Sequence, residues 1–274
     1  PKDIEGFRSF FVKRERRMTG NPGKPLEDRP VALVTGGARR VGAALCRALS
    51  ASGYRVVIHC NRSHAEARGL QDELGGAEYA SVLAADLAKG GAGRLVCSAE
   101  KVFGRLDGIV NNASTYRRKS LLAISDSELR EDLDVNFLAP FQMMREFARR
   151  GKPGWIVNLL DGRIAKDDVE CAGYLLAKKS LAEATRLCAL DWAPLGIRVN
   201  AVAPGFVLPV EGASEDALAR LVERLPLRRR TPVEELAQAV LFLANTSSVT
   251  GTILYLDSGM HLQKSDTGEK STRL

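Results

Sequence analysis

The chain has 274 residues, 45% of them hydrophobic and 27% charged, with 25 glycines, which is a typical globular composition. No apolar run approaches the roughly 20 residues that a membrane helix needs, so we expect a cytoplasmic protein without membrane contact. The five cysteines are scattered without a C-x-x-C pair, which argues against a metal site or a disulfide framework. The net charge is +7, but no nucleic-acid-binding motif accompanies it, and we expect no nucleic-acid partner.

Residues 1–29 are predicted to form a basic arm and linker. Residues 1–30 hold eight Lys and Arg against five Asp and Glu, and residues 19–30 are rich in Gly, Pro and charge. Glu15 argues against an organelle-targeting peptide, since such peptides avoid acids. We expect one large α/β domain over residues 30–263 and a tail over residues 264–274.

From Val31 onward, short apolar runs alternate with longer segments of helical apolar spacing. The runs expected to be buried strands are Val31–Val34, Arg55–His59, Tyr79–Ala84, Gly108–Val110, Trp155–Leu160, Ile197–Val202 and Thr252–Leu256. Alternation over about seven units predicts a single Rossmann-type doubly wound parallel sheet with helices on both faces.

Two of the helical segments carry start signals. Ser125-x-x-Glu128 is a capping box, and Thr231-Pro232-x-Glu234 is predicted to be a second one with Pro at the first helical position.

Polar or turn-forming residues follow the first six predicted strands. In strand order they are Arg39 and Arg40, Asn61–Ser63, Asp86, Asn112–Tyr116, Asp161, and Pro204–Gly205. In a parallel sheet of this kind, ligands bind beyond the carboxyl ends of the strands, and all of these positions lie at that edge. The sequence therefore predicts one ligand site there.

The first strand runs into the segment T-G-G-A-R-R-V-G at residues 35–42, which a helical segment follows. Such a turn of small residues lets backbone N–H groups approach a pyrophosphate at the positive end of the helix. The glycines would also suit a tight turn that binds nothing. Because strand, turn and helix are in register, we favour dinucleotide binding, with candidate ligands Gly36, Arg39, Arg40, Val41 and Gly42.

The second strand ends in Asn61-Arg62-Ser63. Enzymes that choose NAD usually place an acid about 20 residues beyond the glycines, but the first acid here is Glu66, inside the next helical segment. A guanidinium group suits a ribose 2′-phosphate, so Arg62 with Ser63 indicates NADPH. Arg62 is also compatible with an ordinary exposed loop.

Tyr174 and Lys178 are four residues apart and would share one helical face. A phenol has an unperturbed pKa of about 10, and a nearby cation eases loss of its proton. Asp161 lies thirteen residues before Tyr174 and adds a carboxylate. Y-x-x-x-K also occurs on ordinary amphipathic helices, so the other motifs must decide between the two interpretations.

These motifs resemble the short-chain dehydrogenase/reductase superfamily over roughly Val31 to Leu262. Besides the glycine loop, the matching motifs are Asp86-Leu87, Asn111-Asn112-Ala113, Asn136, Tyr174-x-x-x-Lys178, Pro204-Gly205, and Thr250-Gly251 with Asp257-x-Gly259. Beyond the loop, the resemblance implies cofactor binding by Asn61, Arg62, Ser63, Asp86, Leu87, Asn112, Ala113, Tyr174, Lys178, Pro204 and Gly205. It also implies a homotetramer that packs through the helices near Ser125–Arg149 and Tyr174–Trp192.

Two departures from the usual pattern resemble the pteridine reductase and dihydromonapterin reductase branch. Arg40 replaces the middle glycine of the loop, and Asp161 stands where most members have Ser. The branch also has an aromatic residue that stacks on the pterin, which implies this role for Tyr116, although Tyr116 would equally suit a half-buried loop. The substrate contacts implied are Arg40, Ser114, Tyr116, Asp161, Tyr174, Phe206 and Leu208.

The resemblance implies that NADPH reduces a C=N bond of a pterin, with Asp161, Tyr174, Lys178 and Asn136 as the catalytic set. Tyr174 would supply the proton, Lys178 would bind the nicotinamide ribose and lower the pKa of Tyr174, and Asn136 would help hold a lysine-linked water. A carboxylate at position 161 would repel the oxygen of a reacting ketone but stabilise a protonated ring nitrogen. Asp161 therefore favours reduction of an imine-like bond.

Two alternatives remain open from the sequence. The expected substrate lid, Phe206–Leu227, does not identify a ligand, so a ketone, an acyl thioester or another imine is also possible. A non-catalytic NADP-binding sensor or scaffold is the alternative of another class, and the presence of Asp161, Tyr174 and Lys178 argues against it.

Overall fold

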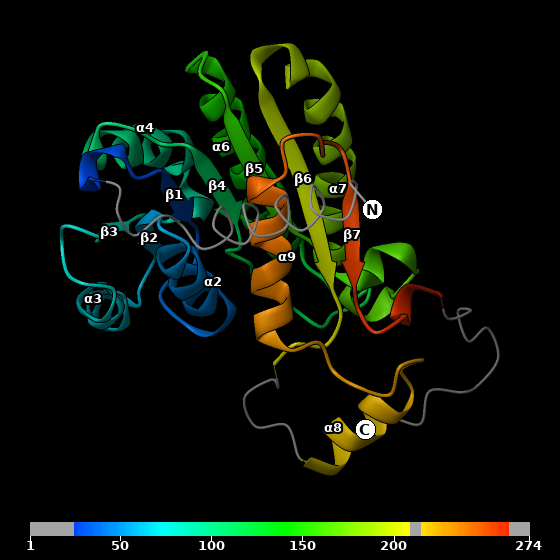
Figure 1. Cartoon of the computed structure of the whole chain (residues 1–274). Coiled ribbons are helices and arrows are strands. Elements are labelled where there is room, and N and C mark those ends of the chain that lie inside the picture. The colour runs from blue at the N-terminus through cyan, green and yellow to red at the C-terminus, as the bar shows by residue number, and fades with distance from the viewer. Residues whose placement is uncertain (1–24, 209–214, 263–274) are drawn as a thin grey trace, which may run out of the picture.

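Seven parallel strands form one sheet in the computed structural model, which describes residues 25–208 and 215–262 (Figure 1). The strands are β1 (Val31–Val34), β2 (Arg55–Cys60), β3 (Ala80–Ala84), β4 (Gly108–Asn111), β5 (Gly154–Leu159), β6 (Ile197–Pro204) and β7 (Ile253–Leu256). Their order is β3-β2-β1-β4-β5-β6-β7. The predicted fold class is confirmed. The predictions for residues 1–24 and 264–274 lie outside the described residues.

Helices cover both faces of the sheet. They are α2 (Arg40–Ala51), α3 (His64–Glu73), α4 (Ala92–Phe103), α5 (Asp126–Leu133), α6 (Ala139–Arg149), α7 (Ala172–Trp192), α8 (Glu215–Glu223) and α9 (Val233–Asn245). The 3-10 turns are η1 (Leu26–Asp28), η2 (Leu87–Lys89), η4 (Gly162–Ala165), η5 (Val169–Cys171), η6 (Ala193–Leu195) and η7 (Met260–Leu262), and η3 (Asp134–Leu138) is a π-helix. Within the described residues, none of the helices is long and apolar enough to cross a membrane. The cytoplasmic location stays a prediction.

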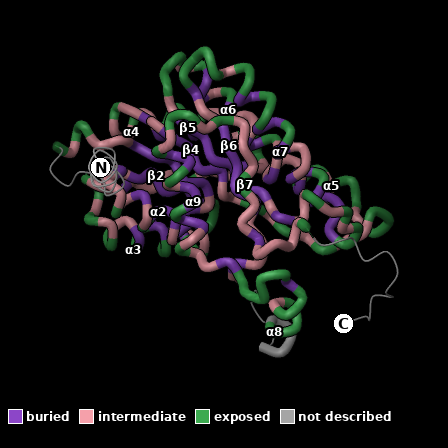
Figure 2. The backbone as a smooth tube through the Cα atoms, turned by 45° about the vertical axis from the view of Figure 1, so that its right-hand side comes forward, coloured by how far each residue is buried: buried purple, intermediate pink, exposed green. Residues whose placement is uncertain are grey.

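The alternation of side chains along β1 divides the core into two layers. Val31 and Leu33 pack with buried residues of α4, α6 and α7, whereas Ala32 and Val34 pack with α2, α3 and α9. Strand side chains alternate between the faces of a sheet, so a strand covered on both sides must be apolar throughout. Figure 2 shows the central strands buried between helices whose outer sides are exposed.

One of the two predicted capping boxes is confirmed. The Ser125 hydroxyl accepts from the Glu128 N–H, and the Glu128 carboxylate accepts from the Ser125 N–H. The prediction at Thr231 is wrong, because α9 begins at Val233 with Pro232 as its N-cap and no side-chain cap. Thr231 is buried, and its hydroxyl donates to the Leu256 carbonyl (2.8 Å), so it joins the start of α9 to the end of β7.

Candidate active site

The site lies where the strand order reverses, between β1 and β4, which is where doubly wound sheets bind ligands. Thr35 follows β1 and is buried. Its Oγ1 accepts from the backbone N–H groups of Asn112 and Ala113, both at 2.9 Å. The Asn112 side chain donates to the carbonyls of Thr35 (2.8 Å) and Gly36 (3.2 Å). Asn112 and Ala113 therefore join the glycine loop to the end of β4.

The glycine loop is closely packed. A Cβ on Gly42 would lie 2.1 Å from the Gly36 carbonyl oxygen, so no other residue fits at position 42. Gly36 has a φ of 60°, and Arg40 has a φ of 53°. An L-residue in this left-handed region costs about 1–2 kcal/mol, a cost that glycine does not have. The backbone at Arg40 therefore has a conformation that is typical of glycine.

The amino end of α2 is open to an anion. Arg39 is its N-cap, no side chain caps its free N–H groups, and no acid lies in its first turn. Uncapped amides at a helix amino end bind phosphate groups readily. Arg39 itself pairs with Glu66 of α3 at 3.7 Å, and both side chains are about half exposed.

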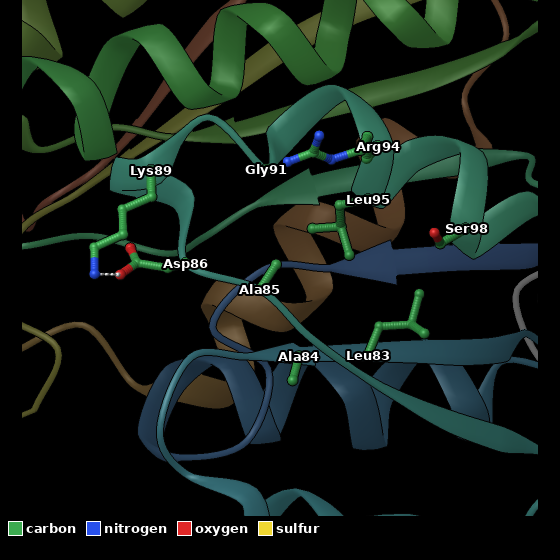
Figure 3. Close-up of a pocket in the computed structure, with 9 residues that line it drawn as sticks. All are labelled: Leu83, Ala84, Ala85, Asp86, Lys89, Gly91, Arg94, Leu95 and Ser98. Atoms are coloured by element: carbon green, nitrogen blue, oxygen red, sulfur yellow. Dashed lines mark ion pairs between the residues drawn. The ribbon is translucent and has the colours of Figure 1, made fainter.

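The ends of β2 and β3 carry the other predicted cofactor residues. Asn61 and Arg62 are exposed and Ser63 is half-buried. Asp86 accepts from the Ala88 N–H (3.1 Å), caps η2, and pairs with Lys89 at 3.8 Å. Asp86 and Lys89 line a shallow pocket together with Arg94 (Figure 3), and Leu87 is buried beside them.

His59 is a residue of this site that the sequence analysis did not identify. It is buried, its Nδ1 accepts from the Gly36 N–H at 3.1 Å, and its Nε2 lies 3.1 Å from the Ala85 carbonyl. Only the neutral ring with its proton on Nε2 satisfies both bonds. His59 therefore connects the glycine loop to the end of β3. In the sequence, His59 lies within a run that is predicted to be an apolar strand, and no motif marks it as a residue of the site.

The stability of the apo protein is expected to depend on the charge of His59. Burial lowers the pKa of His59 and outweighs the bond to Ala85. Its stabilising contribution is therefore present above pH about 6.5 and is lost as the pH falls through the lower folded pKa. Losing the Gly36 bond costs about 1–3 kcal/mol, and each kcal/mol lowers Tm by about 2–4 °C.

Thermal unfolding between pH 7.5 and 5 measures this dependence. His59→Asn is expected to start from a lower Tm and to flatten the decline. His64→Asn, at an exposed histidine of α3, is the control and is expected to keep the wild-type slope. A wild-type slope in His59→Asn would contradict the assignment.

The structure brings Asp161, Tyr174 and Lys178 together. The Tyr174 hydroxyl donates to Asp161 Oδ2 at 3.0 Å, and Lys178 Nζ lies 5.8 Å from the centre of the Tyr174 ring. Lys178 is buried and donates to the Leu159 carbonyl at 2.7 Å. The three side chains come from the end of β5 and the first turns of α7.

Burial and charge control proton binding in this group. Burial, and then the charge of Asp161, raises the pKa of Tyr174 well above its usual value. Burial lowers the pKa of Lys178 to about 8, although Asp161 opposes the change. This differs from the expectation that Lys178 lowers the pKa of Tyr174, because burial of the hydroxyl and then the charge of Asp161 raise that pKa. Tyr174 is a neutral phenol with a proton to donate.

Asn136 lies in the π-helix η3 and is buried. Its amide donates to the carbonyls of Thr115 and Asp132, both at 3.0 Å, and its oxygen accepts from the Ser114 hydroxyl at 2.6 Å. These bonds hold the loop after β4. No direct Asn136–Lys178 bond is present, so the predicted water link stays a prediction.

Tyr116 lies beside Tyr174 and Arg163. Its ring meets the Tyr174 ring edge to face, with centroids 5.1 Å apart, and half of Tyr116 is exposed. Arg163, which the sequence analysis missed, donates to both oxygens of Asp161 and to the Tyr116 hydroxyl. The available signal was an arginine two residues after Asp161, a spacing that a tight turn brings together.

The end of β6 supplies the remaining predicted residues. Pro204 ends the strand, and the Gly205 N–H donates to the Leu256 carbonyl at 2.9 Å. A Cβ on Gly205 would lie 2.7 Å from the Asp257 Cα, so this position needs glycine. Phe206 and Leu208 are half-buried. The expected lid is described only in part, because residues 209–214 lie outside the described residues.

Comparison with known proteins identifies the family. A family model described as enoyl-(acyl carrier protein) reductase matches residues 36–261. The chain belongs to the short-chain dehydrogenase/reductase family. This family member is 34% identical over 244 residues to a putative ketoacyl reductase of the granaticin polyketide synthase from Streptomyces violaceoruber, covering 85% of the chain and 96% of that protein. It is therefore an oxidoreductase.

Two further matches confirm the resemblance to the pteridine reductase branch. The family member is 30% identical over 281 residues to pteridine reductase 1 of Leishmania tarentolae, covering 86% of the chain and 97% of that protein. It also matches the crystal structure of FolM alternative dihydrofolate reductase 1 from Brucella canis complexed with NADP. The TM-score is 0.82 and the identity 33%, with 92% of this chain and 98% of that chain covered.

Proposed function

We propose that the protein is an NADPH-dependent reductase that adds hydride to a C=N bond of a pterin-type ring, as in dihydrobiopterin, dihydromonapterin or dihydrofolate. The observation that carries this proposal is the Asp161 carboxylate bonded to the Tyr174 hydroxyl at 3.0 Å, beneath the half-exposed ring of Tyr116. A carboxylate here stabilises positive charge on a ring nitrogen and destabilises negative charge on a ketone oxygen.

The predicted cofactor residues fit a dinucleotide phosphate. The uncapped amino end of α2 suits a pyrophosphate, and Arg40 with Arg62 and Ser63 offers charge and hydrogen bonds to a 2′-phosphate. Lys178 would bind the nicotinamide ribose. NADPH, when bound, supplies the hydride. The Brucella canis protein, named as complexed with NADP, supports this assignment.

The residues of the chain account for the other parts of the reaction. Tyr174 holds a proton at neutral pH because burial and Asp161 raise its pKa, and it donates that proton directly or through water. Asp161 stabilises the cationic nitrogen. Tyr116 is half exposed, and its ring is the aromatic surface on which a flat substrate ring would stack.

A substrate panel tests the proposal. Purified protein is mixed with NADPH or NADH and with dihydrobiopterin, dihydromonapterin, dihydrofolate or a β-ketoacyl thioester, and cofactor absorbance is followed. We expect turnover of at least one pterin, with NADPH preferred. Turnover of the thioester alone would favour the ketoacyl activity that the name of the Streptomyces relative suggests. NADPH binding without any turnover would favour the sensor alternative.

Arg40→Gly is expected to separate folding from binding. Glycine removes the left-handed strain of about 1–2 kcal/mol but adds about 0.5–1 kcal/mol of chain entropy to the unfolded state, so its Tm should equal or slightly exceed that of Arg40→Ala, which loses the same side-chain contacts. NADPH affinity should fall, because a phosphate contact of the loop is lost. Thermal unfolding and fluorescence titration measure the two effects. Arg40→Ala, which keeps the strain, is the control and should be the less stable variant.

The proposed homotetramer has support in one apolar surface. On α7, Leu176, Leu187 and Leu190 are exposed, and Phe137 and Phe141 line a hollow beside them. A patch of this kind on a protein surface commonly marks a contact with another chain. Light scattering of the purified protein would give the number of subunits.

A further inference from the structure

We propose that Arg163 is a positioning residue that holds the Asp161 carboxylate directed at Tyr174 while it anchors Tyr116. This inference rests on the proposed function and deepens it. Arg163 would couple the group that stabilises the reacting nitrogen to the surface on which the ring stacks.

Arg163 makes three hydrogen bonds to the Asp161 carboxylate. Its Nε lies 3.1 Å from Asp161 Oδ1, its Nη2 lies 2.9 Å from Oδ2, and its backbone N–H donates to Oδ1 at 2.8 Å. Paired guanidinium bonds fix both the charge and the plane of a carboxylate. Oδ2 also accepts from the Tyr174 hydroxyl. The pairing with Arg163 therefore leaves Asp161 bonded to the proton donor.

The remaining nitrogen of Arg163 extends to the other wall of the site. Nη1 donates to the Tyr116 hydroxyl at 3.1 Å and lies 3.5 Å from Asp168 Oδ2. The guanidinium carbon is 5.0 Å from the centre of the Tyr116 ring and 5.7 Å from that of Tyr174. One cation therefore contacts the acid, the platform and the ring of the proton donor.

The turn that carries both residues is held from behind. Gly162 separates Asp161 from Arg163, and a Cβ on it would lie 2.8 Å from Met260 Cε and 2.9 Å from Asp257 Oδ2. The turn is thus pressed against η7 and the segment before it. This packing restricts the turn. Loss of the Arg163 guanidinium should therefore change the contacts of the Asp161 carboxylate more than the backbone conformation of the turn.

The loss of Arg163 has a predictable direction. Arg163 contacts the Asp161 carboxylate directly, whereas Lys178 donates to the Leu159 carbonyl. Without the paired guanidinium bonds, the carboxylate would be free to rotate away from the Tyr174 hydroxyl and would no longer be held where it stabilises a cationic ring.

The first test compares Arg163→Met with wild type, using whichever acceptor the enzyme reduces. We expect kcat to fall about 10- to 100-fold, the effect of losing a hydrogen bond between charged groups, with NADPH affinity within about twofold. Added guanidinium ion should restore part of the rate, and Arg163→Lys should keep more of the rate than Arg163→Met. Asp168→Asn, which also contacts Arg163 but not Tyr174, is the matched control and should keep a rate near that of wild type. An unchanged kcat in Arg163→Met would overturn the inference.

The second test needs no turnover. In crystal structures with NADP+ bound, the Asp161 carboxylate of Arg163→Met should turn away from the Tyr174 hydroxyl and the Tyr116 ring should shift relative to wild type. Arg163→Gln replaces the Met variant if that variant does not fold. Side chains of Asp161 and Tyr116 that stay in place would refute the role of Arg163. If wild type reduces no pterin but these side chains move in the variant, the proposed function fails and the inference on Arg163 stands.

Discussion

Tyr174→Phe is expected to lower kcat about 10²–10⁴-fold, the range that a positioned proton donor contributes. The phenol donates to Asp161 at 3.0 Å and is the neutral acid of the site. The ring and its packing are kept in Phe, so the dissociation constant for NADPH should change less than threefold. Single-turnover kinetics with NADPH, and fluorescence titration of the cofactor, measure the two quantities separately.

Tyr116→Phe is the matched control, since the same atom is deleted from the neighbouring tyrosine. It loses the hydroxyl that accepts from Arg163 but keeps the half-exposed aromatic ring. We expect a loss of less than about tenfold in kcat/KM, because the contact is one hydrogen bond to a charged group. Equal losses in the two variants would show that proton donation does not belong to Tyr174.

Asp161→Ser is expected to lower turnover of a pterin about 100-fold or more. Removing one charge-stabilising group from a reacting centre typically costs 10²–10³ in kcat. The serine hydroxyl can steady a developing oxyanion, so the ratio of ketone to pterin turnover should rise. Assays of both acceptors with the same preparation measure this ratio, and cofactor titration should give a dissociation constant near that of wild type.

Asp161→Asn separates charge from shape in the same position. It keeps the size of the side chain, so a loss as large as that of the serine variant would attribute the effect to the charge. Wild-type pterin turnover in both variants would remove Asp161 from the mechanism. A loss of NADPH binding equal to the loss of turnover would make Asp161 a structural residue.

The periodicity of the chain was sufficient to predict the sheet, since all seven apolar runs are strands and each boundary lies within two residues of the prediction. Strands buried on both faces must be continuously apolar, and that signal is local. The meeting of Asp161 with Tyr174 was also predictable, because parallel strands and a family motif place both at one edge.

Contacts that depend on side-chain direction were not predictable. Arg163 and His59 act through hydrogen bonds that form only after the turn after β5 and the ends of β2 and β3 are in place. Thr231 has the sequence of a cap, but burial against β7 gave its hydroxyl a different acceptor. The bonds of Asn136 to Thr115 and Ser114 in the loop after β4 were likewise not foreseen, and its expected water link to Lys178 stays a prediction.

The closeness of Gly162 to Asp257 and Met260 has a practical consequence for handling the protein. Asp257 and Met260 pack behind the turn that carries Asp161, although they are about a hundred residues away along the chain. Shortening the polypeptide to or past Met260 would therefore disturb the position of Asp161 as well as folding. An affinity tag fused close to Met260 should be compared with an untagged preparation before kinetic constants are assigned.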